Sequence, residues 1–317
     1  MKKCKVFIFG YYGFKNTGDD AMEQALINEL AGRYMNIIRY HEGDTLFSIL
    51  KHIIEAGVVF VGGGTHLRNW GRKGAWQSAR IILLGLICRL LGKEFNMVNV
   101  GIDGEKLEWI VKRIANKVTI RDKQTADSAL LLNFTPQPKE KLLGINLRSV
   151  NSTYYNNELK DDMLVLEVCK AIKKWQVKYP DWKVRFFSFN AGKDTDEEIC
   201  YHASQLVPNS TLCHWRPSIY DTLSEVSRCG LFIGMRYHSL VFAYMANAPF
   251  VAIESYPRCH KFNDYIRNPI RSIGMDDILS GKLSALLLEA MKIRGKTVAS
   301  WLPLDEARKL AKKGIVT

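Results

Sequence analysis

The sequence lacks the features of membrane-spanning, secreted and disulfide-bonded chains. Its longest apolar run, Ile81–Cys88, extends past Arg89 only as far as Leu91, whereas a membrane-spanning helix needs about 20 apolar residues. The N-terminus has no small-residue cleavage site of the kind found in signal peptides. The seven cysteines are odd in number and form no CxxC motif, which is typical of reduced thiols. We therefore expect a cytoplasmic protein.

Standard motifs for metals and nucleotides are absent as well. Histidine and cysteine lie close together at Cys200–His202, Cys213–His214 and Cys259–His260, but none of these pairs has the spacing of a zinc site. We therefore expect no metal. The first strand-like segment is followed by neither GxGxxG nor a Walker sequence. The glycines that follow this segment, Gly10, Gly13 and Gly18, therefore do not belong to either of these nucleotide-binding motifs.

Acidic residues are scarce in two segments of a basic chain. The 45 Lys and Arg residues outnumber the 32 Asp and Glu residues, which gives a net charge of +13. Residues 66–93 have a net charge of +6 without a single acid, and residues 282–317 have a net charge of +5. Such basic patches favour an anionic partner, either a phosphorylated substrate, an anionic lipid or a nucleic acid.

What is present is an alternation of short β-rich runs with helix-length segments. This pattern predicts an α/β fold with doubly wound parallel sheets. At 317 residues the chain has room for about two domains, and the proline-containing stretch 133–141 reads as a linker. We expect Rossmann-like domains at residues 1–137 and 138–317, facing a central cleft. The predicted strands are 5–9, 58–61, 96–100, 117–120, 142–147, 183–189, 230–234 and 250–253.

Glycines and acids follow the first predicted strand, in Gly10–Asp20. Three glycines allow tight turns and a close approach of ligand to backbone. Asp19 and Asp20 open the next helix, where they repel a phosphate, so they either cap the helix or act on a substrate. A triple glycine, Gly62–Gly64, follows a later strand. It either packs closely or leaves open backbone amides near a ligand.

Polar side chains follow four predicted strands of the second half. They are Arg148, Asn190, Arg236 with His238, and Glu254 followed by Arg258. Because ligands of open α/β sheets bind beyond the carboxyl ends of the strands, we expect these groups to converge on one crevice. Arginine provides planar bidentate donors, and the helix after His238 adds its dipole. The pattern predicts a site for a small, multiply charged anion.

These motifs together resemble the polysaccharide pyruvyl transferase family. The matching segments are Gly10–Asp20, Gly62–Gly64, Ile120–Asp122, Gly234–Ala243, Asn247–Pro249 and Tyr256–Arg258. The resemblance spans residues 5–262 and implies a glycosyltransferase-B-like pair of domains. It also implies an enzyme that transfers pyruvate from phosphoenolpyruvate to a sugar as a cyclic ketal. Members act on cell-surface glycan precursors, which are often lipid-linked and lie at the cytoplasmic face of the membrane.

This resemblance suggests roles for the basic residues. Phosphoenolpyruvate has a phosphate and a carboxylate, so we expect Arg148 and Arg258 to bind it. Arg236 is either a third clamp or a structural support. His238 is expected to protonate the enol methylene or to hold the leaving phosphate, because histidine exchanges protons near neutral pH. Phosphoenolpyruvate is a donor substrate here, and no cofactor is expected.

The acids of the first half are assigned to the sugar acceptor. Asp19 or Asp20 is expected to accept a proton from a sugar hydroxyl. The N-terminal domain is then the acceptor side, and the C-terminal domain is the phosphoenolpyruvate side. Further substrate-binding residues are expected to be Asn190, Asn16, Gly13, Gly63, Gly64 and Thr65.

Two other functions fit the sequence. One is a nucleotide-sugar-dependent glycosyltransferase of the same fold. The other is a non-catalytic anion- or nucleic-acid-binding protein, although the sequence contains no nucleic-acid motif and we expect no nucleic acid as partner.

The basic clusters suggest a further partner. Arg68, Arg72 and Lys73, together with Arg308–Lys313, are expected to dock the enzyme peripherally on an anionic membrane at the inner face of the cell membrane. There it would meet an acceptor linked to polyprenyl diphosphate. The apolar run Ile81–Leu91 between the basic clusters is expected to be a largely buried helix.

Overall fold

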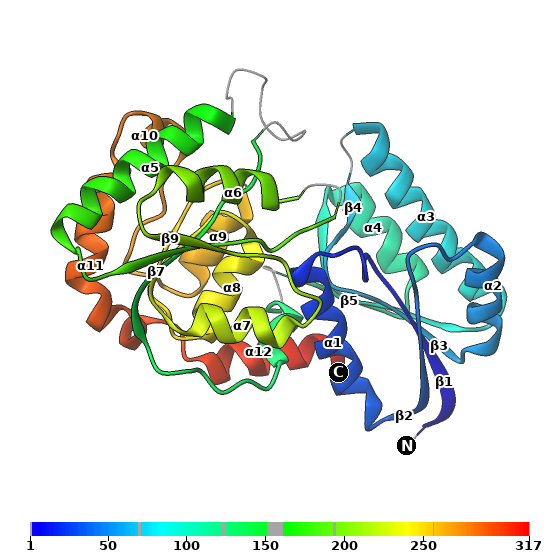
Figure 1. Ribbon diagram of the computed structural model, residues 1–317. Coiled ribbons are helices and arrows are strands. Elements are labelled where there is room, and N and C mark those ends of the chain that lie inside the picture. Colours follow the sequence, from blue (N-terminus) through cyan, green and yellow to red (C-terminus); the bar gives the residue numbers. More distant parts are fainter. Residues whose placement is uncertain are drawn as a thin grey trace. The chain divides into compact units, whose positions relative to one another are not determined.

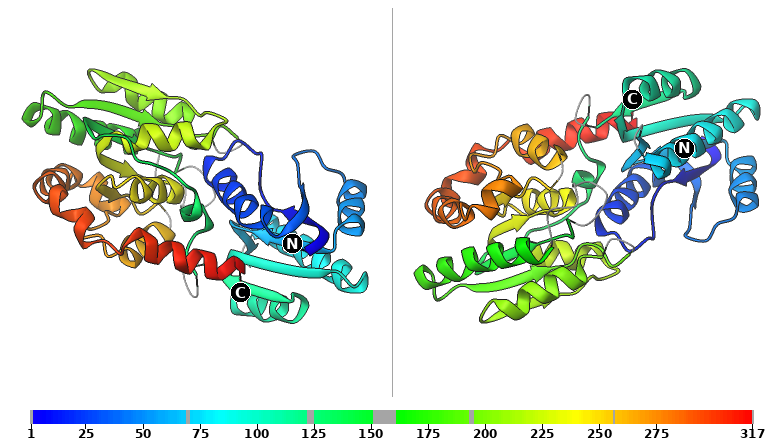
Figure 2. Two further views of the ribbon diagram at one scale, coloured as in Figure 1. Left: turned by 90° about the horizontal axis from the view of Figure 1, so that it is seen from below. Right: turned by 90° about the horizontal axis from the view of Figure 1, so that it is seen from above.

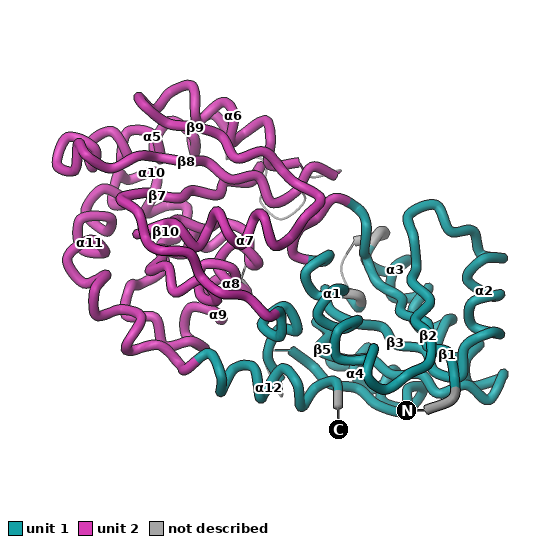
Figure 3. The backbone as a smooth tube through the Cα atoms, turned by 60° about the horizontal axis from the view of Figure 1, so that its bottom comes forward, with its two compact units in different colours: residues 1–14, 19–132, 304–317 teal, residues 15–18, 133–303 magenta. Residues whose placement is uncertain are grey.

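The computed structural model describes residues 2–68, 71–121, 125–150, 161–192, 195–255 and 257–316. The chain divides into two compact units (Figure 3). Unit 1 comprises Met1–Phe14, Asp19–Leu132 and Leu304–Thr317, and unit 2 comprises Lys15–Gly18 and Asn133–Pro303. Each unit is a parallel sheet with helices packed on it (Figure 1), so the predicted α/β class with two Rossmann-like parts is confirmed.

Unit 1 has a six-stranded sheet in the order β2-β1-β3-β5-β4, with β6 also paired to β5. Its strands are β1 (Lys2–Phe9), β2 (Tyr34–Arg39), β3 (Val58–Gly62), β4 (Thr65–Arg68), β5 (Glu94–Asp103) and β6 (Lys117–Ile120). Its helices are α1 (Thr17–Ala31), α2 (Leu46–Glu55), α3 (Gly71–Leu90), α4 (Glu105–Ile114), the 3-10 helix η1 (Ser128–Leu131) and α12 (Leu304–Val316). Strand β3 is apolar and buried throughout, as a parallel strand covered on both faces must be.

Unit 2 has a five-stranded sheet in the order β11-β10-β7-β8-β9. Its strands are β7 (Glu140–Asn146), β8 (Lys183–Phe187), β9 (Ser210–Cys213), β10 (Cys229–Gly234) and β11 (Phe250–Ala252). Its helices are α5 (Asp161–Lys178), α6 (Glu197–Leu206), α7 (Ile219–Ser227), α8 (Tyr237–Met245), α9 (Pro257–Tyr265), α10 (Met275–Leu279) and α11 (Leu283–Ser300). The chain order reverses between β7 and β10, so their carboxyl ends form the switch point where such sheets bind ligands.

Helix α12 packs in unit 1, although the sequence assigned residues 138–317 to a second domain. The buried side chain of Asn99 in β5 donates from Nδ2 to the carbonyl of Ala311 at 2.9 Å, and Figure 2 shows α12 beside this strand. Gly314 allows the close approach, because a Cβ there would lie 1.7 Å from Oδ1 of Asn99. One cause of the difference is therefore a buried amide contact between distant residues, which hydrophobic patterning does not reveal.

Helix α3 corrects a second expectation. Ile81, Leu84 and Cys88 are buried in the core of unit 1, as predicted for the apolar run. The opposite face of the run is not buried, and its exposed side chains are Leu83, Leu86, Leu90 and Leu91. Across the ranges that the structure describes, no helix is both long and apolar enough to cross a membrane.

Candidate functional site

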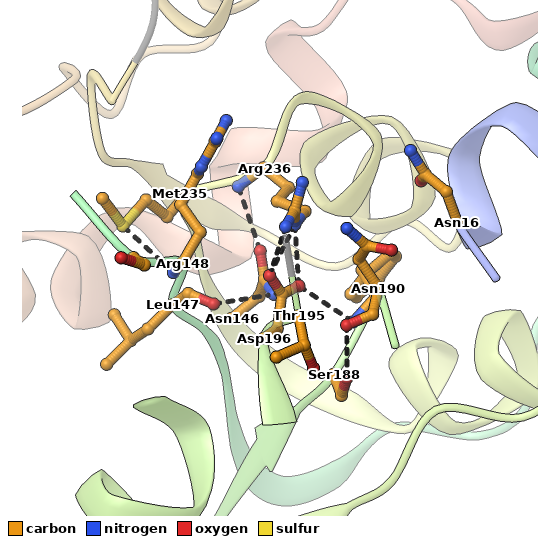
Figure 4. A network of polar contacts seen from close by, with 12 residues as sticks. Asn16, Asn146, Leu147, Arg148, Ser188, Asn190, Thr195, Asp196, Met235 and Arg236 are labelled. Carbon is orange, nitrogen blue, oxygen red and sulfur yellow. Dashed lines mark hydrogen bonds and ion pairs between the residues drawn. The ribbon is translucent and has the colours of Figure 1, made fainter. Parts of the chain in front are cut away.

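The switch point of unit 2 is organised by Asn146, the last residue of β7 (Figure 4). Asn146 is fully buried, and its Oδ1 accepts the backbone N–H of Arg236 at 3.0 Å. Its Nδ2 donates to the carbonyl of Phe187 at 3.0 Å and to Oδ2 of Asp196 at 3.1 Å. One amide therefore ties together the loops that follow β7, β8 and β10.

Asp196 is the buried centre of this network. Its Oδ2 accepts the backbone N–H of Phe189 at 3.1 Å, and both of its oxygens face the guanidinium of Arg236. The Nε of Arg236 lies 2.6 Å from Oδ1 and 2.8 Å from Oδ2. Four donor contacts compensate for the loss of water around a fully buried carboxylate. Sequence reasoning missed Asp196, and its position just before helix α6 was the only available signal.

Arg236 forms the N-cap of α8, two residues after the end of β10. Only 13% of its side chain is exposed, and its pairing with Asp196 holds the guanidinium in one orientation. Of the two roles that the sequence allowed, this contact supports the structural one directly. The same contact leaves Arg236 at the carboxyl end of the sheet, where a ligand of unit 2 is expected.

His238 lies in the first turn of α8 and is half-buried. Its ring packs against Gly18, since a Cβ at Gly18 would lie only 2.0 Å from Nδ1. Tyr237 meets the imidazole edge-on, with ring centroids 5.1 Å apart. Gly18 and Tyr237 were not named as site residues, although both lie in motifs that the sequence singled out. The imidazole is thus held in a defined place by its neighbours.

The segment Lys15–Gly18, which includes the first two residues of α1, belongs to unit 2. Asn16 and Asn190 form an isolated antiparallel bridge. The backbone N–H of Thr17 donates to the carbonyl of Phe189 at 2.9 Å, and Oδ1 of Asn16 accepts from Gly18 at 3.2 Å. Two predicted substrate-binding residues, Asn16 and Asn190, are therefore brought together, although they are far apart in the sequence.

Arg148 and Arg258 also lie near the carboxyl ends of β7 and β10. The backbone N–H of Arg148 donates to the sulfur of Met235 at 3.3 Å, and Arg148 is half-buried. Arg258, 9% exposed, lies in the first turn of α9. The neighbouring Cys259 donates from its sulfur to the carbonyl of Met235 at 3.6 Å. Met235 thus links the two loops that hold these arginines.

The predicted acids lie in the first turn of α1. Oδ1 of Asp20 accepts the N–H of Gly13 at 2.8 Å, and Gly13 has a φ of +77°, a value that favours glycine. Burial is the main cause that raises the pKa of Asp20 above its usual value, and the hydrogen bond from Gly13 opposes this shift. Asp19 is partly buried one residue earlier.

The triple glycine packs closely within unit 1. The N–H of Gly63 donates to the carbonyl of Val98 at 3.3 Å, and that of Gly64 to the sulfur of Met22 at 3.3 Å. A Cβ at Gly63 would lie 2.6 Å from the same sulfur. Of the two alternatives, close packing is therefore the one that these two glycines show, because α1 and β5 supply partners for their amides. Thr65 begins β4 and is half-buried.

Comparison with protein families decides the class of the chain. Residues 16–255 match the model of the family described as polysaccharide pyruvyl transferase. The chain belongs to this family. The resemblance inferred from the sequence motifs is thereby confirmed, and the network around Asn146 lies inside the matched region of the pyruvyl transferase chain. A comparison with curated protein sequences gives no match.

Solved structures resemble this pyruvyl transferase family member in fold. UDP-GlcNAc 2-epimerase from Neisseria meningitidis, bound to UDP-GlcNAc, matches with a TM-score of 0.60 at 10% identity, covering 98% of each chain. A putative UDP-N-acetylglucosamine 2-epimerase from Listeria monocytogenes matches with a TM-score of 0.61 at 11% identity, covering 98% of this chain and 94% of that one. These likenesses support the glycosyltransferase-B-like fold alone. Among the side chains that the structure describes, no cluster of His, Cys, Asp and Glu could hold a metal ion.

Proposed function

We propose that this chain transfers pyruvate from phosphoenolpyruvate to two hydroxyls of a sugar, forming a cyclic ketal and releasing phosphate. Family membership supports pyruvyl transfer. The observation that carries the proposal is the group of Arg148, Arg236 and His238 at the carboxyl ends of β7 and β10. A donor with a phosphate and a carboxylate suits such a group, because arginine binds both anions through paired N–H donors.

Donor binding depends on arginines with different environments. Arg148 and Arg258 bind the two anionic groups of the donor. Arg236 is oriented beforehand by Asp196, whose carboxylate is fully buried. A guanidinium that is already ordered loses less conformational entropy when the donor binds. Asp196 is therefore a positioning residue, acting through Arg236.

The proton and bond changes balance without any oxidation or reduction. His238 donates a proton to the methylene carbon, so that C2 gains cationic character. A sugar hydroxyl bonds to C2 and loses its proton, the bond between C2 and the phosphate oxygen breaks, and a second hydroxyl bonds to C2 and loses its proton. One of the two hydroxyl protons restores His238, and the other leaves with phosphate.

Asp19 or Asp20 accepts one of the two hydroxyl protons from the sugar, and this is the proton that then leaves with phosphate, so the carboxylate is restored. The raised pKa of Asp20 supports this choice, because a carboxylate with a higher pKa is the better base near neutral pH. The acceptor is a saccharide precursor of a cell-surface glycan, linked to polyprenyl diphosphate.

Phosphate release is the direct test. The purified chain is incubated with phosphoenolpyruvate and a panel of lipid-linked sugars, and phosphate is measured together with the mass of the sugar product. We expect stoichiometric phosphate and ketal formation. Thermal shift with phosphoenolpyruvate, UDP-sugars and an oligonucleotide provides the comparison. Stabilisation by a UDP-sugar alone would support a glycosyltransferase, and stabilisation by the oligonucleotide alone would support a nucleic-acid binder.

A matched arginine provides the control for donor binding. Arg294 in α11 stacks on Trp182 at 4.8 Å, just before β8 begins and therefore at the opposite end of the sheet. Arg294→Ala should retain the thermal shift with phosphoenolpyruvate, whereas Arg148→Ala should lose most of it. Equal shifts in both variants would contradict the placement of the donor.

A further inference from the structure

Helix α3 presents an apolar ridge to solvent. Trp76, Leu83 and Leu90 are 69%, 53% and 86% exposed. They are spaced seven residues apart, so they lie nearly in line along the helix over about 21 Å. The buried residues of α3 already hold this helix on the sheet, so the ridge is not needed for the core of unit 1.

Helix α2 supplies a second set of exposed apolar side chains. Leu46, Phe47 and Ile54 are 66%, 78% and 60% exposed. A groove of about 270 Å³ runs between the two helices, lined by Leu46 and Leu50 on one side and by Trp76 and Leu83 on the other. We call the six exposed residues Leu46, Phe47, Ile54, Trp76, Leu83 and Leu90 the α2–α3 face. Leu46, Trp76 and Leu83 line this groove together, and exposed apolar side chains gathered in this way mark an interaction site.

The charge around the α2–α3 face is mainly positive, although one acid, Asp44, also lines the groove. Residues 46–93 contain seven Lys and Arg residues but one acid, Glu55, which pairs with Lys5 at 3.3 Å. Within the described part of the chain, no carboxylate lies within ion-pair distance of the four bases Lys51, Arg80, Arg89 and Lys93.

Local contacts hold three of these bases near the two helices. The guanidinium of Arg80, a residue of the groove, lies 5.9 Å from the ring centroid of Phe9. Nζ of Lys93 donates to the carbonyl of Ile54 at 2.8 Å, and Nη1 of Arg89 donates to that of Arg113 at 2.8 Å. These bases therefore keep their positive charge close to the apolar ridge.

The C-terminal bases, which the sequence also assigned to docking, are engaged differently. Arg308 donates to the carbonyls of Leu130 and Leu132 at 2.9 and 3.0 Å. Lys312 pairs with Glu29 at 3.2 Å. These two residues fasten α12 to unit 1. The side chains of Arg72 and Lys73 lie outside the described residues.

We propose that the α2–α3 face binds the surface of an anionic phospholipid bilayer. The apolar ridge enters the boundary between headgroups and acyl chains, and the four bases meet lipid phosphates. Tryptophan favours this interfacial depth, and an apolar surface flanked by bases is typical of peripheral binding. The excess of bases over acids in residues 46–93 favours an anionic lipid over a second copy of this basic chain, which would repel the same charges. The inference is independent of the transfer reaction.

Vesicle flotation tests this surface. The full chain is mixed with vesicles of phosphatidylcholine alone or with phosphatidylglycerol added, at low salt and at about 1 M salt, where charges are screened beyond about 3 Å. We expect binding to the anionic vesicles, weakened by salt. Leu90→Glu should reduce this binding at least tenfold, and Arg80→Glu by about tenfold, because the charge changes by two and each charge contributes about threefold to fivefold.

A matched control separates the face from general surface apolarity. Val177 in α5 is 84% exposed, so Val177→Glu makes the same kind of change elsewhere and should leave binding unchanged. Quenching by brominated lipid gives a second readout that does not depend on a destabilising variant. Trp76→Phe should remove most of the quenching while keeping binding.

Three results would overturn the proposal. The first is a wild-type chain that does not bind anionic vesicles. The second is equal binding by Leu90→Glu and wild type, or equal loss in Val177→Glu. The third is a dimer in sedimentation that Leu90→Glu dissociates, because the face would then join two copies of the chain.

Discussion

Two buried arginine–aspartate pairs, one in each unit, show how similar contacts can serve different purposes. In unit 1, Arg121 pairs with Asp127, and the side chains are 3% and 0% exposed. In unit 2, Arg236 pairs with Asp196, and the side chains are 13% and 0% exposed. Arg121 directly follows β6, Arg236 lies two residues after the end of β10, and both carboxylates directly precede a helix.

The surroundings of the two pairs differ. Arg121 also contacts the sulfur of Met22 at 3.5 Å, and Oδ1 of Asp127 caps η1 by accepting from Ala129 at 2.8 Å. Around Arg236 the neighbours are the amide of Asn146 and the first turn of α8, with its imidazole. The pair of Arg121 and Asp127 is enclosed in the core, where it holds η1 in place. In the second pair, the guanidinium of Arg236 is partly exposed and has ionisable and amide groups beside it. An ion pair of this kind therefore indicates a ligand-binding site only when one of its side chains is partly exposed and lies beside further polar groups.

The largest effect is expected on the functional side of this comparison, at His238. His238→Gln keeps the size and polarity of the side chain but removes the proton donor, so turnover should fall by about 10²- to 10⁴-fold. The melting temperature should stay close to that of wild type, because the ring is only half-buried. Steady-state phosphate release and calorimetry measure both. Near-normal turnover in a stable variant would leave His238 with a packing role only.

Asp127→Ala should have the largest effect on stability. It leaves Arg121 buried without its carboxylate, which costs about 3–5 kcal/mol of unfolding free energy. The KM for phosphoenolpyruvate should not change in the molecules that stay folded. Urea unfolding and kinetics measure the two quantities, with Asp127→Asn as the milder variant if Asp127→Ala does not fold. A raised KM with unchanged stability would show that the pair of Arg121 and Asp127 supports donor binding and is not purely structural.

Arg148→Ala and Arg258→Ala should each weaken the binding of phosphoenolpyruvate by about 10- to 150-fold. Each substitution removes a charge-assisted hydrogen bond worth about 1.5–3 kcal/mol. Isothermal titration measures the affinity, and Arg294→Ala is the control. If both variants bind the donor as wild type does, the donor lies elsewhere in the chain.

Asp196→Asn should raise the KM for phosphoenolpyruvate by about tenfold, with a smaller change in kcat. The amide keeps the volume of the side chain but loses the charge that orients Arg236. The same substitution at Asp127 is the matched comparison, since it should lower stability without moving KM. A drop in stability alone at both positions would show that Asp196 is as purely structural as Asp127.

The sequence predicted eight of the described strands, because buried parallel strands have continuous apolar runs such as β3. It missed β2, β4 and β9, which lie at the edges of the two sheets. It also predicted the strand-end residues, because parallel topology places the carboxyl ends at one edge. It could not predict the contact of Asn146 with Asp196, or that of Gly18 with His238. These contacts join residues that are far apart in the chain and depend on side-chain geometry, as does the packing of α12. Residues 122–124, part of one recognised motif, lie outside the described residues.

The smallest effect is expected at Asp20. Here the informative quantity is whether the stability of the folded chain rises or falls with pH. Burial raises the pKa of Asp20, so the folded chain holds this proton more tightly than the unfolded chain does. The resulting stability is present at low pH and is lost as the pH rises through the raised pKa. Asp20→Asn cannot ionise, so its melting temperature should rise relative to wild type between about pH 4 and neutrality.

Asp277 gives the control with the opposite sign. A hydrogen bond from Lys282 lowers the pKa of Asp277, so its stabilising contribution is present at neutral pH and is lost as the pH falls. Asp277→Asn should therefore lower the melting temperature slightly at neutral pH and leave it unchanged at low pH. Calorimetry of both variants from about pH 4 to neutrality measures how each melting temperature changes with pH. If the melting temperatures of the two variants, relative to wild type, changed with pH in the same direction, burial would not be raising the pKa of Asp20. The case for Asp20 over Asp19 as the proton acceptor would then fail.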